Sequence, residues 1–181
     1  EPEINFVINK LISKKGTFID IGSNWGHHAF AASLKSKKVV CFEPNPDVIS
    51  DLLRIRKELN LEKKVDFHQV ALSDKNQESL ELVQIGFEPG IASLSQNFNS
   101  RRINSLTFKI LQKFIRMKPS RFKVSVKNID SYEFENIDLI KLDAEGFEYE
   151  ILQGSCKTLE KNNPYLIFEH HYLSNFAQFE L

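Results

Sequence analysis

The sequence has few cysteines and no long hydrophobic run. Its two cysteines, Cys41 and Cys156, lie far apart and in no C-x-x-C pair, which is typical of reduced thiols in a cytoplasmic protein. No apolar stretch approaches the roughly 18 residues that a membrane-spanning helix requires, so we expect no membrane span. Lys plus Arg and Asp plus Glu each total 24, and the absence of net charge argues against a nucleic-acid partner.

Two nucleotide-binding fingerprints are also absent. The sequence has no Gly-Lys-Ser/Thr of a P-loop, and G-x-G-x-x-G fails because Asn24 stands where the glycine after Gly22 is required. What is present is an apolar run ending in a glycine turn, residues 18–26, and a second apolar run ending in Glu43. That carboxylate, about 20 residues after the first glycine, can accept both hydroxyls of a ribose. The sequence therefore predicts a nucleoside pocket without a pyrophosphate site.

Apolar runs and helical patterns alternate along the chain. This order predicts a doubly wound, mostly parallel α/β sheet within one domain, residues 1–181. The expected strands are 17–22, 39–43, 65–70, 79–85, 122–126, 137–143 and 164–168. The expected helices are 25–35, one after Pro46 capped by Asn45 or Asp47, 103–117 and 147–159.

Charge is distributed unevenly in the middle of the chain. Between Glu88 and Asp130 there is no acidic residue, but many basic ones: Arg101, Arg102, Lys109, Lys113, Arg116, Lys118, Arg121, Lys123 and Lys127. We expect a basic helical insert at about residues 86–122. Two interpretations stay open. The basic residues form the solvated outer face of a packed helix, or they form a lid that faces an anionic acceptor such as a phosphate, a sugar acid or a lipid headgroup.

Polar residues follow several expected strands. In open α/β sheets, ligands bind beyond the carboxyl ends of the strands, so these residues are candidate site residues. They are Asp20, Glu43, Asp143, Glu145, Glu169 and His170. Lys141 lies in an otherwise apolar strand, and a buried lysine needs a carboxylate partner, for which Asp143 and Glu169 are the candidates.

Plainer roles remain open for some of these residues. Asp20 can simply tie down the glycine turn. Asp143 and Glu145 can cap the helix that follows them. His27 and His28, in the first turn of a predicted helix, are expected to be surface or packing residues.

Five sequence motifs occur in a specific order. They are F-I-D-I-G-S-N-W-G at 18–26, V-C-F-E-P-N-P at 40–46, V-A-L-S-D at 70–74, I-K-L-D-A-E-G-F-E at 140–148 with L-Q-G at 152–154, and F-E-H-H at 168–171. This series resembles the FkbM family of S-adenosylmethionine-dependent methyltransferases. The K-x-D-x-E-G-x-E block is the strongest part of the resemblance, because generic nucleotide-binding sheets do not carry it.

The resemblance implies a class I methyltransferase, Rossmann-like fold that binds S-adenosylmethionine. The residues that it places around the cofactor are Asp20, Gly22, Asn24 and Gly26 at the amino-acid part, Glu43 at the ribose, and Val70 and Ala71 beside adenine. Asp143 would lie near the reactive methyl. A class I sheet ordinarily continues past its fifth strand, but this chain stops at Leu181. We therefore expect either a sheet truncated after the fifth core strand or closing elements that are supplied in an unusual way. A truncated sheet would expose an edge, with poor solubility or homodimerisation through that edge as the expected consequence.

The resemblance implies methyl transfer to a hydroxyl of a glycan, a polyketide or a similar small metabolite, and the basic segment favours an anionic acceptor. A general base must take the hydroxyl proton, and His170 ranks before Asp143 and Glu145 because the ordinary pKa of histidine lies nearest neutrality. Lys141 would position the carboxylates or stabilise a developing alkoxide. No compact ligand spacing supports a metal site, so none is predicted. The alternatives are an NAD-dependent oxidoreductase and a non-catalytic Rossmann-like binding module.

Overall fold

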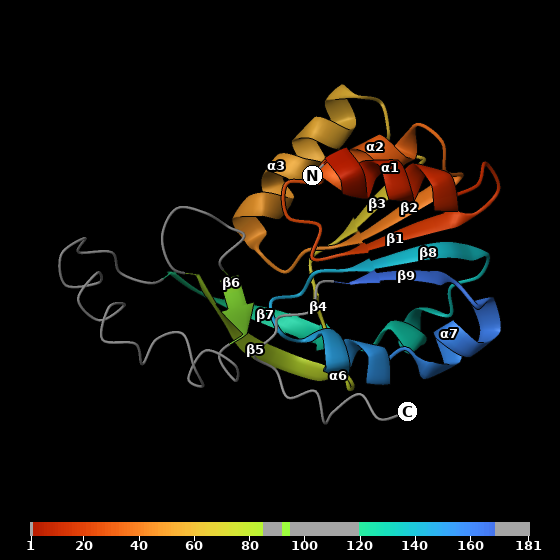
Figure 1. The fold of residues 1–181 in the computed structure, drawn as a ribbon. Coiled ribbons are helices and arrows are strands. Elements are labelled where there is room, and N and C mark those ends of the chain that lie inside the picture. Colours follow the sequence, from red (N-terminus) through yellow and green to blue (C-terminus); the bar gives the residue numbers. More distant parts are fainter. Residues whose placement is uncertain (1, 85–91, 95–119, 169–181) are drawn as a thin grey trace.

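The computed structural model describes residues 2–84, 92–94 and 120–168, which form two sheets and their flanking helices (Figure 1). The strands of the larger sheet are β1 (Thr17–Ile21), β2 (Lys38–Phe42), β3 (Val65–His68), β8 (Ile137–Leu142) and β9 (Tyr165–Phe168). The smaller sheet contains β4 (Ala71–Leu72), β5 (Gln77–Gln84), β6 (Ala92–Leu94) and β7 (Ser120–Lys127). The helices are α1 (Pro2–Leu11), α2 (His27–Ser33), α3 (Pro46–Glu58), α6 (Glu148–Gln153), α7 (Cys156–Asn162) and the 3-10 helix η2 (Ile129–Tyr132).

The larger sheet is five-stranded with the order β3-β2-β1-β8-β9, and every neighbouring pair is parallel. Helices α1, α2 and α3 lie on one side of it, and α6 and α7 lie on the other (Figure 1). The chain order reverses direction between β1 and β8, which is where open α/β sheets bind their ligands. The predicted doubly wound, mostly parallel sheet is confirmed.

Both faces of the central strand β1 are buried. Phe18 packs in a cluster with Ile8 of α1 and Ala29 of α2, whereas Ile19 on the other face packs in a cluster with Ile151 of α6. A strand covered on both faces needs apolar residues at successive positions, which explains Phe18, Ile19 and Ile21, with Asp20 as the buried polar exception.

The smaller sheet was not predicted as a separate unit. Its order is β4-β7-β5-β6, with β4 and β7 parallel and the other pairs antiparallel. The sequence predicted one strand over 65–70, but β3 ends at His68, and the Val70 amide donates to the His68 carbonyl oxygen at 3.0 Å. The chain therefore turns there and enters the other sheet at Ala71, and local strand propensity does not reveal such a change of partner.

Two predicted helices are shorter than expected. Helix α2 begins after Gly26, whose φ of 71° is left-handed, so the turn before it cannot be helical. The predicted helix over 147–159 is divided into α6 and α7 at Gly154, where an added Cβ would lie 2.2 Å from the Ser73 carbonyl oxygen. The Asp130 carboxylate then accepts the Lys157 and Thr158 amides and caps α7.

Other element predictions agree with the structure within two residues. The predicted strands 79–85 and 122–126 correspond to β5 and β7. Asn45 is the N-cap of α3, and its side-chain oxygen accepts the Asp47 amide at 3.0 Å. Among the described helices, none has the length and apolar character needed to cross a membrane.

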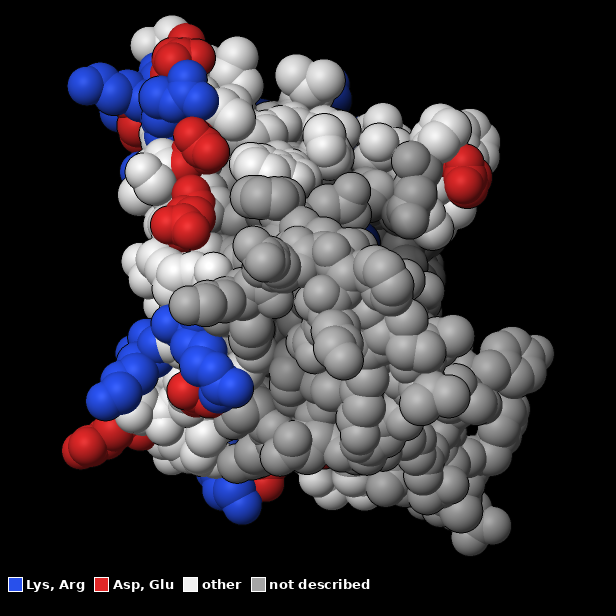
Figure 2. All heavy atoms as spheres, turned by 90° about the vertical axis from the view of Figure 1, so that its left-hand side faces the viewer, with Lys and Arg blue, Asp and Glu red and all other residues white. Residues whose placement is uncertain are grey.

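The predicted helix over 103–117 lies outside the described residues, as do most of the predicted insert at 86–122 and the chain after Phe168. The basic insert, the truncated sheet and the homodimer therefore stay predictions. Arg121 belongs to the predicted insert and lies in β7, within the described residues. Its exposed side chain forms an ion pair with Glu81 of β5. Figure 2 shows the same mixture of charges, because the visible groups of described Lys and Arg side chains lie beside Asp and Glu side chains.

Candidate functional site

The glycine turn after β1 contacts the end of β8. Gly22 has a φ of 72°, and an added Cβ would lie 1.8 Å from the Asp143 carbonyl oxygen. The Asp143 amide in turn donates to the Ile21 carbonyl oxygen at 3.0 Å. Glycine is therefore required at position 22, because any side chain there would collide with the backbone at Asp143. This close contact brings together the first and fourth sequence motifs, residues 18–26 and 140–148.

Buried polar atoms without a hydrogen-bond partner gather at the end of β1 and in the turn that follows it. Among the described residues, no hydrogen bond reaches either carboxylate oxygen of Asp20, the Ser23 hydroxyl or the side-chain oxygen of Asn24. Asn24 adopts a left-handed φ of 45°, a conformation that asparagine tolerates better than most residues. Buried polar atoms are normally satisfied, so a group of them marks a place where a ligand would supply the missing partners.

Glu43 follows β2 and is held by the backbone of two loops. Its side chain is buried, with the residue 7% exposed, and its two carboxylate oxygens accept the amides of Asn24 at 3.0 Å and Asn45 at 2.9 Å. Burial, with a smaller contribution from the charge of Asp20, raises the pKa of Glu43 to about 7, against the lowering effect of those two hydrogen bonds. Each carboxylate oxygen has two acceptor sites, so Glu43 can still accept hydroxyl donors.

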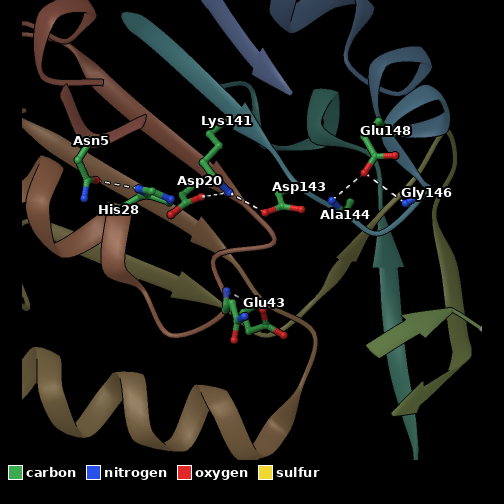
Figure 3. A network of polar contacts seen from close by, with 10 residues as sticks. Asn5, Asp20, His28, Glu43, Lys141, Asp143, Ala144, Gly146 and Glu148 are labelled. Atoms are coloured by element: carbon green, nitrogen blue, oxygen red, sulfur yellow. Dashed lines mark hydrogen bonds and ion pairs between the residues drawn. The ribbon is translucent and has the colours of Figure 1, made fainter. Parts of the chain in front are cut away.

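Asp20, Lys141 and Asp143 form a chain of charges across two neighbouring strands (Figure 3). Asp20 and Lys141 are partners in the parallel register, and the Lys141 ammonium lies 3.6 Å from Asp20 and 3.3 Å from Asp143. The predicted pairing of Lys141 with Asp143 is confirmed, whereas its ion pair with Asp20 was not expected.

The pKa directions follow from this arrangement. Burial raises the pKa of Asp20, although the positive charge of Lys141 lowers it in part. Burial alone would lower the pKa of Lys141, but the charges of Asp20 and Asp143 outweigh burial and raise it. The cluster therefore keeps a protonated lysine between two carboxyl groups.

His28 extends this network toward α1. Its Nδ1 lies 2.7 Å from the Asn5 side-chain oxygen, and Figure 3 shows the ring between Asn5 and Asp20. The charge of His28 is among the influences that lower the pKa of Asp20. The sequence placed His28 among surface or packing residues, because nothing in its spacing indicates that α1 folds back over the end of β1.

Glu148 holds the loop that carries Asp143 and Glu145. One of its carboxylate oxygens accepts the amides of Ala144 at 2.9 Å and Gly146 at 3.2 Å (Figure 3). Glu145, between those amides, has a left-handed φ of 52°. Sequence reasoning included Glu148 in a motif but gave it no role. The signal was an acidic residue shortly after a strand end, a position from which a side chain can reach back to free amides.

The remaining candidate residues fall into two groups. Val70 and Ala71 are buried in a core cluster that includes Leu82 of β5. Glu169 and His170 lie outside the described residues. Over the described ranges, no group of three or more His, Cys, Asp or Glu side chains is arranged to hold a metal ion. The assignment of each candidate to the cofactor or the reaction stays a prediction.

Comparison with known proteins identifies the family. Residues 20–181 match the model of the methyltransferase FkbM domain. The chain belongs to this family. The match confirms the resemblance carried by the five motifs, since it covers the glycine turn, Glu43 and the K-x-D-x-E-G-x-E block.

One characterised relative and one solved structure illustrate the membership. The chain is 28% identical over 155 residues to the hexuronic acid methyltransferase AglP of Haloferax volcanii, an alignment that covers 84% of this chain and 54% of AglP. The FkbM methyltransferase of Methylobacillus flagellatus KT matches with a TM-score of 0.56 and 16% identity, covering 93% of this chain and 39% of that protein. This likeness supports the class I methyltransferase fold. The chain therefore spans about half the length of AglP, and less than half the length of the solved structure.

Proposed function

We propose that this FkbM domain binds S-adenosylmethionine and transfers its methyl group to a hydroxyl of a glycan. The observation that carries the proposal is the group of unsatisfied polar atoms beside Glu43. Four of the five buried side-chain atoms that lack a hydrogen-bond partner among the described residues belong to Asp20, Ser23 and Asn24. They lie at the carboxyl end of β1, next to the point between β1 and β8 where the strand order reverses direction.

The donors and acceptors of this turn fit the cofactor. Asp20 and Asn24 offer acceptor oxygens for an ammonium group, and the Ser23 hydroxyl can donate to a carboxylate. Glu43 offers charged acceptor sites for two vicinal hydroxyls, which favour an ionised partner. When bound, S-adenosylmethionine supplies a methyl group on a positively charged sulfur. Val70 and Ala71 are the proposed neighbours of adenine.

The β8 end supplies groups for the acceptor. The Asp143 side chain is 38% exposed and is oriented by Lys141, while Glu148 fixes the loop on which Asp143 and Glu145 lie. Methyl transfer depends chiefly on aligning the two reactants, so such rigid placement is the main contribution required of the protein. Asp143, Glu145 or His170 would take the hydroxyl proton, with His170 still ranked first.

A sugar acid is the acceptor class that we favour. The relative AglP is a hexuronic acid methyltransferase, and a hexuronic acid carries both hydroxyls and a carboxylate. The acid-free segment from Pro89 to Ile129 is rich in Lys and Arg, so it suits an acceptor of negative charge.

Calorimetric titration with S-adenosylmethionine tests the cofactor assignment. We expect binding by the wild-type chain, and a dissociation constant raised by about tenfold to a hundredfold in Glu43→Ala, because a charge-assisted hydrogen bond contributes about 1.5–3 kcal/mol. Glu62→Ala, at an exposed acidic position, is the matched control and should bind as wild type does. Absence of binding by the folded wild-type chain would overturn the proposal.

A turnover assay tests the reaction. Radiolabelled methyl transfer to glycans that contain hexuronic acid should exceed transfer to their neutral counterparts. Cofactor binding without transfer to any glycan or polyketide hydroxyl would favour the non-catalytic module. Displacement of S-adenosylmethionine by NADH would favour the oxidoreductase.

A further inference from the structure

A buried side-chain pair joins the smaller sheet to the end of β2. Gln84, the last residue of β5, is 8% exposed, and Asn45, the N-cap of α3, is 0% exposed. The Asn45 side-chain amide donates to the Gln84 side-chain oxygen at 2.8 Å. Removing that acceptor would leave a buried N–H₂ donor without this partner, which costs about 1–3 kcal/mol unless the donor moves.

Asn45 is fixed by four hydrogen bonds, and one of them reaches Glu43. Its side-chain oxygen accepts the Asp47 amide, and its carbonyl oxygen accepts the Ile49 amide, both at 3.0 Å. Its own amide donates to a Glu43 carboxylate oxygen at 2.9 Å. The Gln84 contact is therefore one of the four hydrogen bonds that fix the orientation of Asn45, including the orientation of its backbone amide.

The other end of the Glu43 carboxylate is independent of this pair. Its second oxygen accepts the Asn24 amide at 3.0 Å, from the turn after β1. Glu43 is therefore held between two loops, and within the described part of the chain the Asn45–Gln84 hydrogen bond connects the Asn45 side to the smaller sheet. In the strand register Gln84 lies opposite Ala92 of β6 and Ser120 of β7, so three strands of that sheet meet at this residue.

We propose that Gln84 is a positioning residue for Glu43 and acts through Asn45. The Gln84 side chain fixes Asn45, and Asn45 fixes the carboxylate in the orientation that receives ribose hydroxyls. The inference rests on the proposed function of Glu43 in cofactor binding. It adds that the smaller sheet, whose β4 carries the proposed adenine neighbour Ala71, also influences the affinity for the ribose through Gln84 of β5.

A double-mutant cycle tests the proposal. Gln84→Met keeps the length of the side chain and removes the acceptor. We expect it to raise the dissociation constant for S-adenosylmethionine about fivefold, which corresponds to one ordinary hydrogen bond. In a Glu43→Gln background the same change should have almost no further effect, because its route to the ligand is already broken. An equal loss in both backgrounds would show a merely structural role and would overturn the inference.

Two further variants separate positioning from general loosening. Asn45→Ser keeps an N-cap oxygen and the backbone amide but loses the donor to Gln84, so it should reproduce the fivefold loss even if Gln84→Met does not fold. Val83→Ala removes buried apolar packing from the neighbouring position of β5 and should lower the unfolding temperature with little change in affinity. A loss in Val83→Ala as large as in Gln84→Met would contradict the proposal.

Amide hydrogen exchange without ligand distinguishes this inference from the proposed function. In Gln84→Met, exchange at the Asn45 amide should accelerate several-fold, while exchange at the Asn24 amide stays unchanged. If the wild-type chain binds no S-adenosylmethionine, the proposed function fails, and this measurement still decides whether Gln84 positions Glu43. Unchanged exchange at Asn45 would refute the positioning role.

Discussion

Asp20 and Glu43 are buried carboxyl groups at the ends of neighbouring strands, and the protein satisfies them differently. Asp20 is fully buried, receives no hydrogen bond from the described residues, and lies 3.6 Å from the Lys141 ammonium. Glu43 receives two backbone amides instead. The cause is their position. Asp20 lies within β1, where the sheet already uses the backbone amides, whereas Glu43 lies just beyond β2, where loop amides are free to bind a side chain.

This difference affects what each group can do for a ligand. Glu43 is oriented before any ligand arrives, which reduces the ordering that binding requires. Asp20 is balanced by a charge but receives no hydrogen bond from the described residues, so its buried oxygens keep acceptor sites for a donor such as an ammonium group. If the comparison is correct, the two sites should respond to different mutations and to different changes of pH.

The largest expected effect is the loss of the charge beside Asp20. Lys141→Met removes the ammonium between two carboxyl groups while keeping a long side chain. Breaking a buried ion pair typically lowers the free energy of unfolding by about 3–5 kcal/mol. We expect a loss of this size at pH 7 in urea denaturation, and a loss that shrinks as the pH falls, because burial raises the pKa of Asp20 and a protonated Asp20 no longer needs the lysine.

Lys38→Met is the matched control for that change. The ammonium of Lys38 lies 2.6 Å from Asp66, but both side chains are partly exposed. Exposed ion pairs contribute about 0–1 kcal/mol, so the control should change stability little. If both variants lose the same stability, burial does not distinguish the Asp20 site and the comparison fails.

The second effect is a pH dependence that belongs to Glu43. Its folded-state pKa, about 7, exceeds the ordinary value of 4.5, so between these two pH values the folded chain binds more protons at Glu43 than the unfolded chain. The free energy of unfolding should therefore fall as pH rises from 4.5 to 7 and level off above 7, by at most about 3 kcal/mol from this group. Urea denaturation of wild type and Glu43→Gln at several pH values measures the contribution as the difference between their slopes.

Glu43→Gln is itself the control for the other titrating groups, since Asp20 and the histidines are present in both proteins. Its absolute stability is not the measured quantity, because a glutamine amide cannot accept both backbone donors. Identical slopes in the two proteins would show that Glu43 keeps an ordinary pKa when folded.

The sequence predicted the surroundings of Glu43 better than the surroundings of Asp20. Glu43 and its neighbours Asn24 and Asn45 follow strand ends, and strand ends in a parallel sheet meet at one edge whatever the details of packing. The partners of Asp20 depend on tertiary structure. The register between β1 and β8 places Lys141 opposite Asp20, although about 120 residues and a second sheet separate them along the chain.

The fold shows the same division between local and long-range information. The parallel strands and the N-cap at Asn45 are visible in apolar runs and capping chemistry. The change of sheet after His68 and the break at Gly154 were missed, because both depend on contacts with segments distant in sequence. Glu148 was missed as a loop-holding residue for a related reason. A motif shows that a carboxylate is present, but the amides that it binds become apparent only once the loop is folded.

The smallest expected effect concerns the contact between His28 and Asn5, on the side of Asp20 away from Lys141 (Figure 3). Asn5→Leu removes the side-chain partner of His28, 2.7 Å away, from a half-buried position on α1. The loss of one such hydrogen bond should lower the free energy of unfolding by about 1 kcal/mol.

Asn9→Ala, at an exposed position of the same helix, controls for helix propensity and should change stability by less than about 0.5 kcal/mol. In a Lys141→Met background the Asn5 effect should grow, because His28 would then be the remaining described group whose coulombic effect lowers the pKa of Asp20. Strict additivity of the two changes would show that Asn5 and His28 stabilise α1 alone and take no part in balancing the buried carboxylate.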